Sequence, residues 1–200
     1  GRSAARLGMT PGAYRNGAAR EIIGHACRVT SLGPLMMAAT DRGVCFVMFG
    51  DSEEALLLAL ELEFPRADLR PMDPKCAPAL DAWMDALELH LEGAAPLPEI
   101  PLDLRGTAFQ LRVWGFLRGI PGGSTISYTE LAKGIDRPAA FRAAASACGK
   151  NRVAVLVPCH RVLRGDGSLG GFRWGLERKR ALIERERSSR AAPDSHLAES

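Results

Sequence analysis

Residues 151–175 read NRVAVLVPCHRVLRGDGSLGGFRWG, and this stretch carries most of the structural and chemical information in the chain. Its five apolar residues VAVLV predict a buried strand that leads into the interior of the protein. Pro158 then stiffens the backbone, because its ring fixes φ and it has no N–H to donate. Cys159 and His160 follow directly. A cysteine reacts as its thiolate, so a histidine beside it makes the pair a candidate nucleophile and base, although such a dipeptide can also be structural.

Two capping boxes lie upstream of this stretch. Thr107 and Ser127 are each followed three residues later by Gln or Glu, so helices are expected to begin at Ala108 and Tyr128. A short GIDR turn comes next, and Pro138 stands where the first residue of another helix would be, since its missing N–H costs nothing there. A short helix, a tight turn and a second helix predict a helix-turn-helix.

The helix expected over residues 138–149 is rich in alanine. Its spacing predicts a core face with Phe141, Ala145 and Cys148, and a second face with Arg142, Ser146 and Lys150. The alanines can serve close packing between two helices. They can equally form a smooth surface that a nucleic-acid groove accepts, with Arg142 projecting from it.

The first half of the chain predicts an α+β domain. The runs EIIGHACRVT, PLMMAAT and VCFVMFG are separated by SLG and TDRG turns, which predicts an antiparallel meander. Asp51, with Glu54 completing a capping box, is expected to open a helix, and a second helix is expected over residues 77–91. The proline-rich EGAAPLPEIPLDLRG predicts a linker.

This gives a small N-terminal domain of an antiparallel sheet plus helices, with its linker, over residues 21–100. A mostly helical domain with the helix-turn-helix and a buried PCHR turn follows over residues 101–187. Residues 1–20 are expected to be a linker. Residues 188–200 are expected to be disordered, because they are polar and without periodicity.

Composition excludes several classes of protein. Of 200 residues, 46% are hydrophobic and 24% charged, and no apolar run reaches the roughly 18 residues of a membrane helix. Five cysteines without paired spacing argue against a disulfide framework and a CxxC zinc site. We therefore expect a cytoplasmic protein without a membrane segment. Its net charge of +3 permits a nucleic-acid partner.

PCHRV, the helix-turn-helix before it and the glycine-rich GSLGGFRWG after it together resemble the O6-alkylguanine-DNA alkyltransferases. The resemblance covers residues 22–186 and is densest in RGTAFQLRVW, ISYTELA, PCHRV and WGLERKRAL. It implies a ribonuclease-H-like N-terminal domain and no cofactor or metal. It also implies irreversible, single-turnover transfer of the alkyl group from O6-alkylguanine, and from O4-alkylthymine, in double-stranded DNA to Cys159 of a monomer.

The resemblance also implies a role for several residues. Cys159 matches the alkyl acceptor, and His160 matches the base that withdraws its proton through a water. Glu186 matches the acid that orients this histidine, although within ERERSSR it can be a solvated charge. Asn151 matches the residue that braces the active-site turn, and its alternative is a helix-end cap. Many members have proline after this asparagine, whereas this chain has Arg152.

Further matches concern DNA. Tyr128 matches the tyrosine that crowds the target phosphate and helps turn the base outward, although it can also be a core residue. Arg142 matches the arginine that enters the base stack, and the carbonyl of Val162 is expected to accept from the guanine amino group. Ser146 and Lys150 are expected to contact DNA. Arg161 is expected to be structural, as an ion-pair partner.

Residues 7–15, LGMTPGAYR, are similar to the end of an AraC-type DNA-binding domain. An Ada-type protein carries such a domain before its alkyltransferase, so the chain resembles the carboxyl-terminal part of an Ada-type protein that is fused to regulatory domains. The alternative function is therefore a DNA-binding transcription regulator module. A cysteine hydrolase would leave the helix-turn-helix unexplained, and a lesion-binding relative without activity would lack Cys159.

Overall fold

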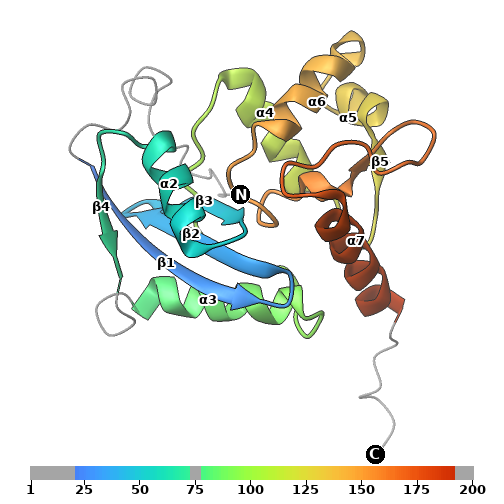
Figure 1. Ribbon diagram of the computed structural model, residues 1–200. Coiled ribbons are helices and arrows are strands. Elements are labelled where there is room, and N and C mark those ends of the chain that lie inside the picture. Colours follow the sequence, from blue (N-terminus) through green and yellow to red (C-terminus); the bar gives the residue numbers. More distant parts are fainter. Residues whose placement is uncertain (1–20, 73–77, 192–200) are drawn as a thin grey trace, which may run out of the picture.

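The computed structural model describes residues 21–72 and 78–191. Figure 1 shows a sheet with its helices on one side of the molecule and a group of helices on the other. The stretch that is similar to an AraC-type domain lies outside the described residues. None of the described helices is both long and apolar enough to cross a membrane.

The predicted antiparallel meander is present. Strands β1 (Ile22–Thr30), β2 (Gly33–Thr40) and β3 (Gly43–Phe49) pair in this order. The expectation of a wholly antiparallel sheet is wrong, because a fourth strand, β4 (Asp68–Pro71), pairs parallel to β1. The sheet is mixed, with the order β3-β2-β1-β4. The four residues of β4 are mostly exposed, so they carry no apolar alternation that sequence analysis could detect.

Helices α2 (Glu53–Glu63) and α3 (Pro78–Leu91) pack against this sheet. The prediction that Asp51 caps α2 is wrong by one residue. Ser52 is the cap, since its backbone is extended and its hydroxyl accepts from the Ala55 N–H at 3.2 Å. Helix α3 was predicted to start at residue 77, and this residue lies outside the described residues.

The second half holds the predicted helix-turn-helix. Both capping boxes are present, and they start helices α4 (Ala108–Arg118) and α5 (Tyr128–Gly134). Pro138 opens a 3-10 turn, η1 (Pro138–Ala140), that runs into α6 (Phe141–Gly149). The short strands β5 (Ile126–Ser127) and β6 (Val162–Leu163) pair in parallel and join α5 to the segment after Cys159.

The predicted core face of α6 is wrong in part. Ala144, Ala147 and Cys148 are buried, whereas Phe141 is 42% exposed. The alanines allow α4 to approach closely, and Trp114 of α4 donates from its indole N–H to the Ala147 carbonyl at 2.9 Å. The face of α6 that holds Ala144, Ala147 and Cys148 therefore points inward, and Phe141 lies outside that face.

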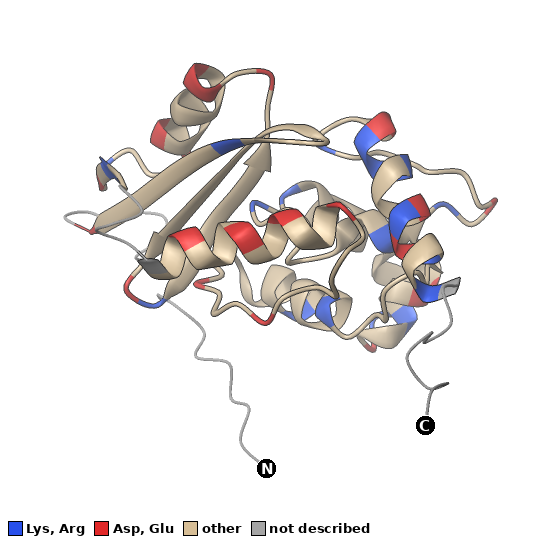
Figure 2. Ribbon diagram, turned by 90° about the horizontal axis from the view of Figure 1, so that it is seen from below, with Lys and Arg blue, Asp and Glu red and all other residues tan. Residues whose placement is uncertain are grey.

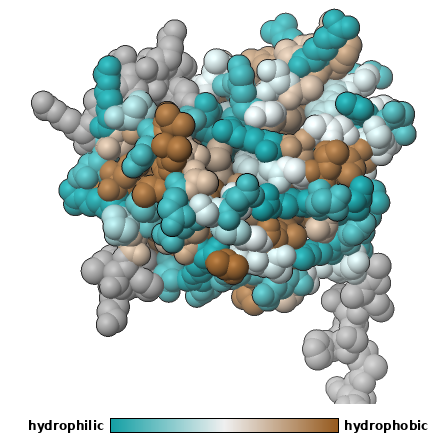
Figure 3. Space-filling model, in the orientation of Figure 1, coloured by the Kyte–Doolittle hydropathy of each residue, from teal (hydrophilic) through white to brown (hydrophobic). Residues whose placement is uncertain are grey.

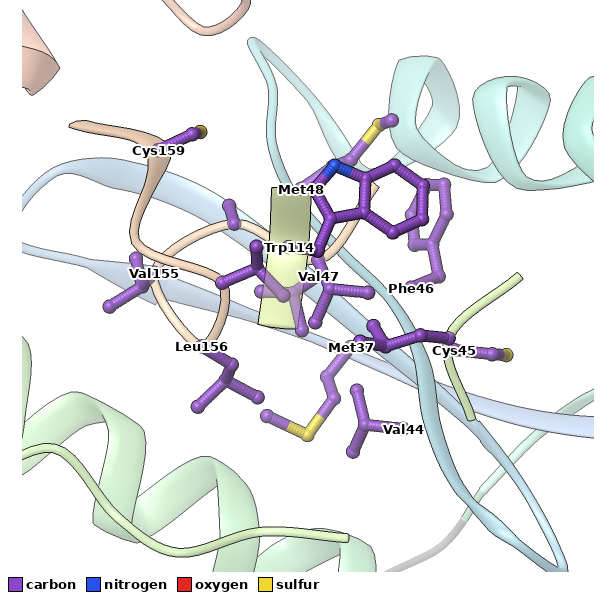
Figure 4. Close-up of a cluster of buried hydrophobic side chains, with 14 of the residues drawn as sticks. Met37, Val44, Cys45, Phe46, Val47, Met48, Trp114, Val155, Leu156 and Cys159 are labelled. Atoms are coloured by element: carbon purple, nitrogen blue, oxygen red, sulfur yellow. The ribbon is translucent and has the colours of Figure 1, made fainter. Parts of the chain in front are cut away.

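The VAVLV run is buried as predicted but is not a strand. Only Val153 forms a bridge, to Val47 of β3, and the chain then turns, with Val155 at φ +68°. A short apolar run indicates that its residues are buried, but it does not distinguish a strand from a buried turn. Figure 4 shows Val155 and Leu156 in one hydrophobic cluster with Val47 and with Trp114. The core is thus continuous between the two halves of the chain.

Two elements complete the fold. The 3-10 turn η2 (Cys159–Arg161) follows the buried turn, and helix α7 (Leu176–Ala191) closes the described chain. The expectation of disorder from residue 188 is wrong for residues 188–191, since α7 continues through them. The remainder of that predicted tail lies outside the described residues.

Candidate active site

Cys159 lines a cavity of about 500 Å³ and is itself 5% exposed. The cavity is lined by residues of α5, of α6 and of the glycine-rich segment after β6. Tyr128, Cys148 and Phe172 contribute to its wall. The start of the helix-turn-helix and the PCHR turn thus share one cavity, as a base drawn out of a duplex would require.

Asn151 holds the turn that leads to Cys159. Its side-chain amide donates to the Val157 carbonyl at 2.8 Å and to the Cys159 Sγ at 3.3 Å. Its side-chain oxygen accepts from the Val153 N–H at 2.9 Å. One buried side chain therefore bonds to both ends of the turn and to the sulfur itself.

Cys159 is a thiol at rest. Burial raises its pKa to about 11, while the hydrogen bond from Asn151 and the charge of Lys179 act in the opposite direction. The thiolate needed for a displacement therefore has to be produced by transfer of the proton to a nearby base.

His160, Glu186 and Arg161 form a buried cluster behind the turn. The His160 Nε2 lies 2.8 Å from the Glu186 Oε1, and the Arg161 guanidinium donates to both carboxylate oxygens at 2.8 and 2.9 Å. Burial alone would raise the pKa of Glu186, but these hydrogen bonds lower it well below its usual value. The carboxylate is therefore ionised, and Arg161 is the ion-pair partner that the sequence predicted.

The ring of His160 is fully buried, and its two nitrogens are in different environments. The Nε2 faces an ionised carboxylate and so carries the proton of the neutral ring. The Nδ1 has no hydrogen-bond partner among the described groups. Burial lowers the pKa of His160, and Glu186 offsets part of this lowering. The neutral ring therefore presents a free lone pair on Nδ1, as a general base requires.

Lys179 also belongs to the site, although its place in the charged run LERKR gives no signal for such a role. This lysine on α7 is fully buried, and its ammonium donates to the carbonyls of Val162 at 2.7 Å, of Leu169, and of Gly171 at 3.3 Å. It thereby holds the glycine-rich segment over the cavity. The Val162 carbonyl, which was expected to accept from guanine, already accepts from Lys179, so one lone pair remains for a ligand.

Of the residues expected to contact DNA, Tyr128 lines this cavity, and Arg142, Ser146 and Lys150 lie on α6 or at its C-terminal end. Arg142, Ser146 and Lys150 are all exposed, as their helical spacing predicts. Tyr128 is half-buried in the cavity wall, and burial raises its pKa to about 12, so its hydroxyl stays protonated. The Arg142 guanidinium lies over the Phe141 ring, 5.5 Å from its centroid.

The charge of the chain is divided between its two halves. Residues 101–187 hold 16 Lys and Arg and 7 Asp and Glu. Residues 21–100 hold 5 Lys and Arg and 14 Asp and Glu. Figure 2 shows the acidic residues along α3 and the basic residues on the helices of the other half. The half that carries the helix-turn-helix is therefore the half that attracts a polyanion.

Comparison with known proteins identifies the family. Residues 108–188 match the family described as 6-O-methylguanine DNA methyltransferase, DNA binding domain. An inducible methylated-DNA–protein-cysteine methyltransferase of Bacillus subtilis is 37% identical over 159 residues, which is 79% of this chain and 87% of that protein. The chain belongs to the methylated-DNA–protein-cysteine methyltransferase family.

Members of this methyltransferase family also share its fold. A crystal structure of Mycobacterium tuberculosis OGT in complex with DNA superposes with a TM-score of 0.71 and 34% identity, over 83% of this chain and 94% of that one. The bifunctional transcriptional activator/DNA repair enzyme Ada of Escherichia coli is 43% identical over 180 residues, which is 90% of this chain. The chain spans 50% of that protein.

The family match spans the elements from α4 to α7 and therefore includes Asn151, Cys159, His160 and Glu186. A second, larger cavity of about 790 Å³ is also present. It reaches Arg161 and Glu186 but not Cys159, so the smaller cavity is the candidate active site. Among the described residues no group of His, Cys, Asp or Glu is arranged to hold a metal ion.

Proposed function

We propose that this chain repairs O6-alkylguanine, and O4-alkylthymine, in double-stranded DNA by moving the alkyl group to Cys159. The observation that carries the proposal is a thiol, held by Asn151, that lines a cavity bordered by the helix-turn-helix and is followed in the sequence by a buried histidine held by Glu186. No cofactor is needed, because the thiol itself is the acceptor. The repair acts in the cytoplasm on DNA, with the chain as a monomer.

Recognition begins with the duplex. A base inside a duplex cannot reach a buried sulfur, so the damaged nucleotide has to turn out of the helix, at a cost of a few kcal/mol. Arg142 projects from an alanine-rich face and fills the vacated space. Tyr128 crowds the phosphate of the target nucleotide. Ser146 and Lys150 contact the DNA backbone, while the Val162 carbonyl accepts from the guanine amino group.

Chemistry follows at the sulfur. His160 takes the thiol proton at Nδ1 through an intervening water, and Glu186 stabilises the imidazolium that forms. The thiolate attacks the alkyl carbon, so an S–C bond forms while the bond from that carbon to O6 breaks. The guanine leaves as a neutral base after it gains a proton. The thioether has no carbonyl for water to attack, so the protein is consumed.

A regulatory role would require domains beyond the alkyltransferase itself. The Escherichia coli relative is named a transcriptional activator as well as a repair enzyme, and this chain spans half of it. We propose that the natural protein continues upstream with regulatory domains of the Ada type. Within this chain, the exposed face of α6 offers few side chains that can read base edges, which favours repair over sequence-specific regulation.

The test is transfer of a labelled methyl group from a duplex with one O6-methylguanine to the protein. Cys148 provides a matched control, because it lines the same cavity and burial raises its pKa as well. Cys148→Ser should accept the label and Cys159→Ser should not. Label in neither the parent protein nor Cys148→Ser would refute the proposed function.

A further inference from the structure

The turn between Asn151 and Cys159 is held in an unfavourable conformation. Residues 154–157 belong to neither a helix nor a strand, and Val155 has φ +68°, in the left-handed region that β-branched residues avoid. Such a backbone persists only where its surroundings fix it. The groups that fix this turn therefore also decide where the Cys159 sulfur lies.

The N-terminal half supplies much of this support. The Val47 N–H of β3 donates to the Arg152 carbonyl at 2.7 Å, and the Val47 carbonyl accepts from the Ala154 N–H at 2.9 Å. The Arg152 side chain forms an ion pair with Glu63, the last residue of α2. Both side chains are largely buried, with 19% and 14% of their surface exposed, so water weakens the pair less than it would at the surface.

Arg152 is the residue directly after Asn151. Its guanidinium also donates to the Lys150 carbonyl at 3.3 Å, on the other side of Asn151. The ion pair with Glu63 therefore fixes the backbone on both sides of the asparagine whose amide lies 3.3 Å from the Cys159 sulfur.

We propose that the Glu63–Arg152 ion pair is a positioning device through which the N-terminal half sets the reactivity of Cys159. The proposal rests on the proposed function for the role of Cys159. Glu63 forms its ion pair with Arg152. It acts through Arg152 on Asn151, and the Asn151 amide donates to the sulfur and favours the thiolate.

The direction of the effect follows from that hydrogen bond. When the ion pair is lost, Asn151 is held less firmly and donates less well to the sulfur. The thiolate then loses a stabilising contact, so the pKa of Cys159 should rise further and its reaction with any alkylating agent should slow. A misplacement of the order of 1 Å at a reacting group can cost up to about a hundredfold in rate.

The test compares Glu63→Gln with Glu61→Gln, a matched control on the exposed face of the same helix. Modification of Cys159 by iodoacetamide is followed across pH by peptide mass analysis, together with methyl transfer from a damaged duplex. We expect Glu63→Gln to react about tenfold more slowly in both assays and to move the apparent pKa of the thiol upward. Glu61→Gln should match the parent protein.

A charge exchange separates positioning from stability. The double variant Glu63→Arg with Arg152→Glu restores opposite charges across the contact, so it should recover most of the lost rate, while Arg152→Glu alone should not. If Glu63→Gln keeps the parent's thiol pKa and rates, or if it loses rate only in proportion to unfolded protein seen by thermal melting, the inference is overturned. Methyl transfer by the parent protein in the same assay reports separately on the proposed function.

Discussion

The Nε2 of His160 lies 2.8 Å from the Oε1 of Glu186, although the two residues are 26 positions apart in the sequence. Glu186 is itself fixed, because Arg161 and the Gly123 N–H both donate to its carboxylate. The imidazole therefore cannot rotate freely. Its Nδ1 is left as the nitrogen that can accept a proton, which supports its proposed role as a base.

Replacing the acid should slow the chemistry more than it changes the fold. In Glu186→Gln the amide cannot stabilise an imidazolium as a carboxylate does, so alkyl transfer should slow by about 10²-fold or more. Single-turnover transfer from a methylated duplex measures this. Glu184→Gln is the control, since Glu184 is exposed on the same helix. Equal rates in both variants would remove Glu186 from the mechanism.

The same carboxylate should make stability depend on pH. The folded pKa of Glu186 lies well below its ordinary value of 4.5. A depressed pKa contributes stability that is present above pH 4.5 and is lost as the pH falls further toward the folded pKa. The difference in unfolding free energy between the parent and Glu186→Gln should therefore shrink as urea titrations move from pH 7 to pH 3.5. A difference that stays constant over this range would contradict the ion pair.

Lys179→Met should loosen the segment above the cavity. Three carbonyl groups lose their charged donor, and each unsatisfied buried group costs about 1–3 kcal/mol. Amide hydrogen exchange should accelerate over residues 163–172, and alkyl transfer should slow. Lys133→Met, at an exposed site on α5, is the control. Unchanged exchange in this segment would show that other contacts hold it.

Arg142→Ala should distinguish flipping from bond breaking. Repair of a lesion in a duplex should fall by about 10–100-fold, since turning out a paired base costs a few kcal/mol and we propose that Arg142 offsets part of this cost. Repair of the same lesion in a single strand should change little. Arg118→Ala is the control, because Arg118 lines the second cavity and not the one that holds Cys159. Equal losses on both substrates would assign Arg142 another role.

Local signals made much of the fold predictable. The capping boxes at Thr107 and Ser127 mark two helix starts correctly, since hydroxyl caps act through neighbouring residues alone. Two features that depend on tertiary packing were not predictable: the core face of α6 and the backbone shape of the VAVLV run. The helical spacing predicts Phe141 on the core face of α6, but the buried residues of this helix are Ala144, Ala147 and Cys148, and Phe141 is 42% exposed. The apolar VAVLV run predicts that these residues are buried, but it does not show that their backbone forms a turn and not a strand.

The candidate site shows the same division. Asn151, Cys159, His160 and Glu186 could be named from a resemblance, and the structure brings them together. Lys179 could not be named, because in LERKR it is one charge in a charged run. Its ammonium can be buried because it donates to three carbonyls of the segment before α7. No pattern in the sequence predicts that this segment folds back onto the helix.

In the proposed mechanism each molecule accepts one alkyl group and then stops. The most direct measurement mixes the protein with an excess of duplex that carries labelled O6-methylguanine and follows transfer over time. We expect a burst equal to the amount of active protein, with no steady state after it, and one added methyl group on the peptide with Cys159. Turnover beyond one equivalent, or a methyl group on Cys148 in place of Cys159, would contradict this mechanism.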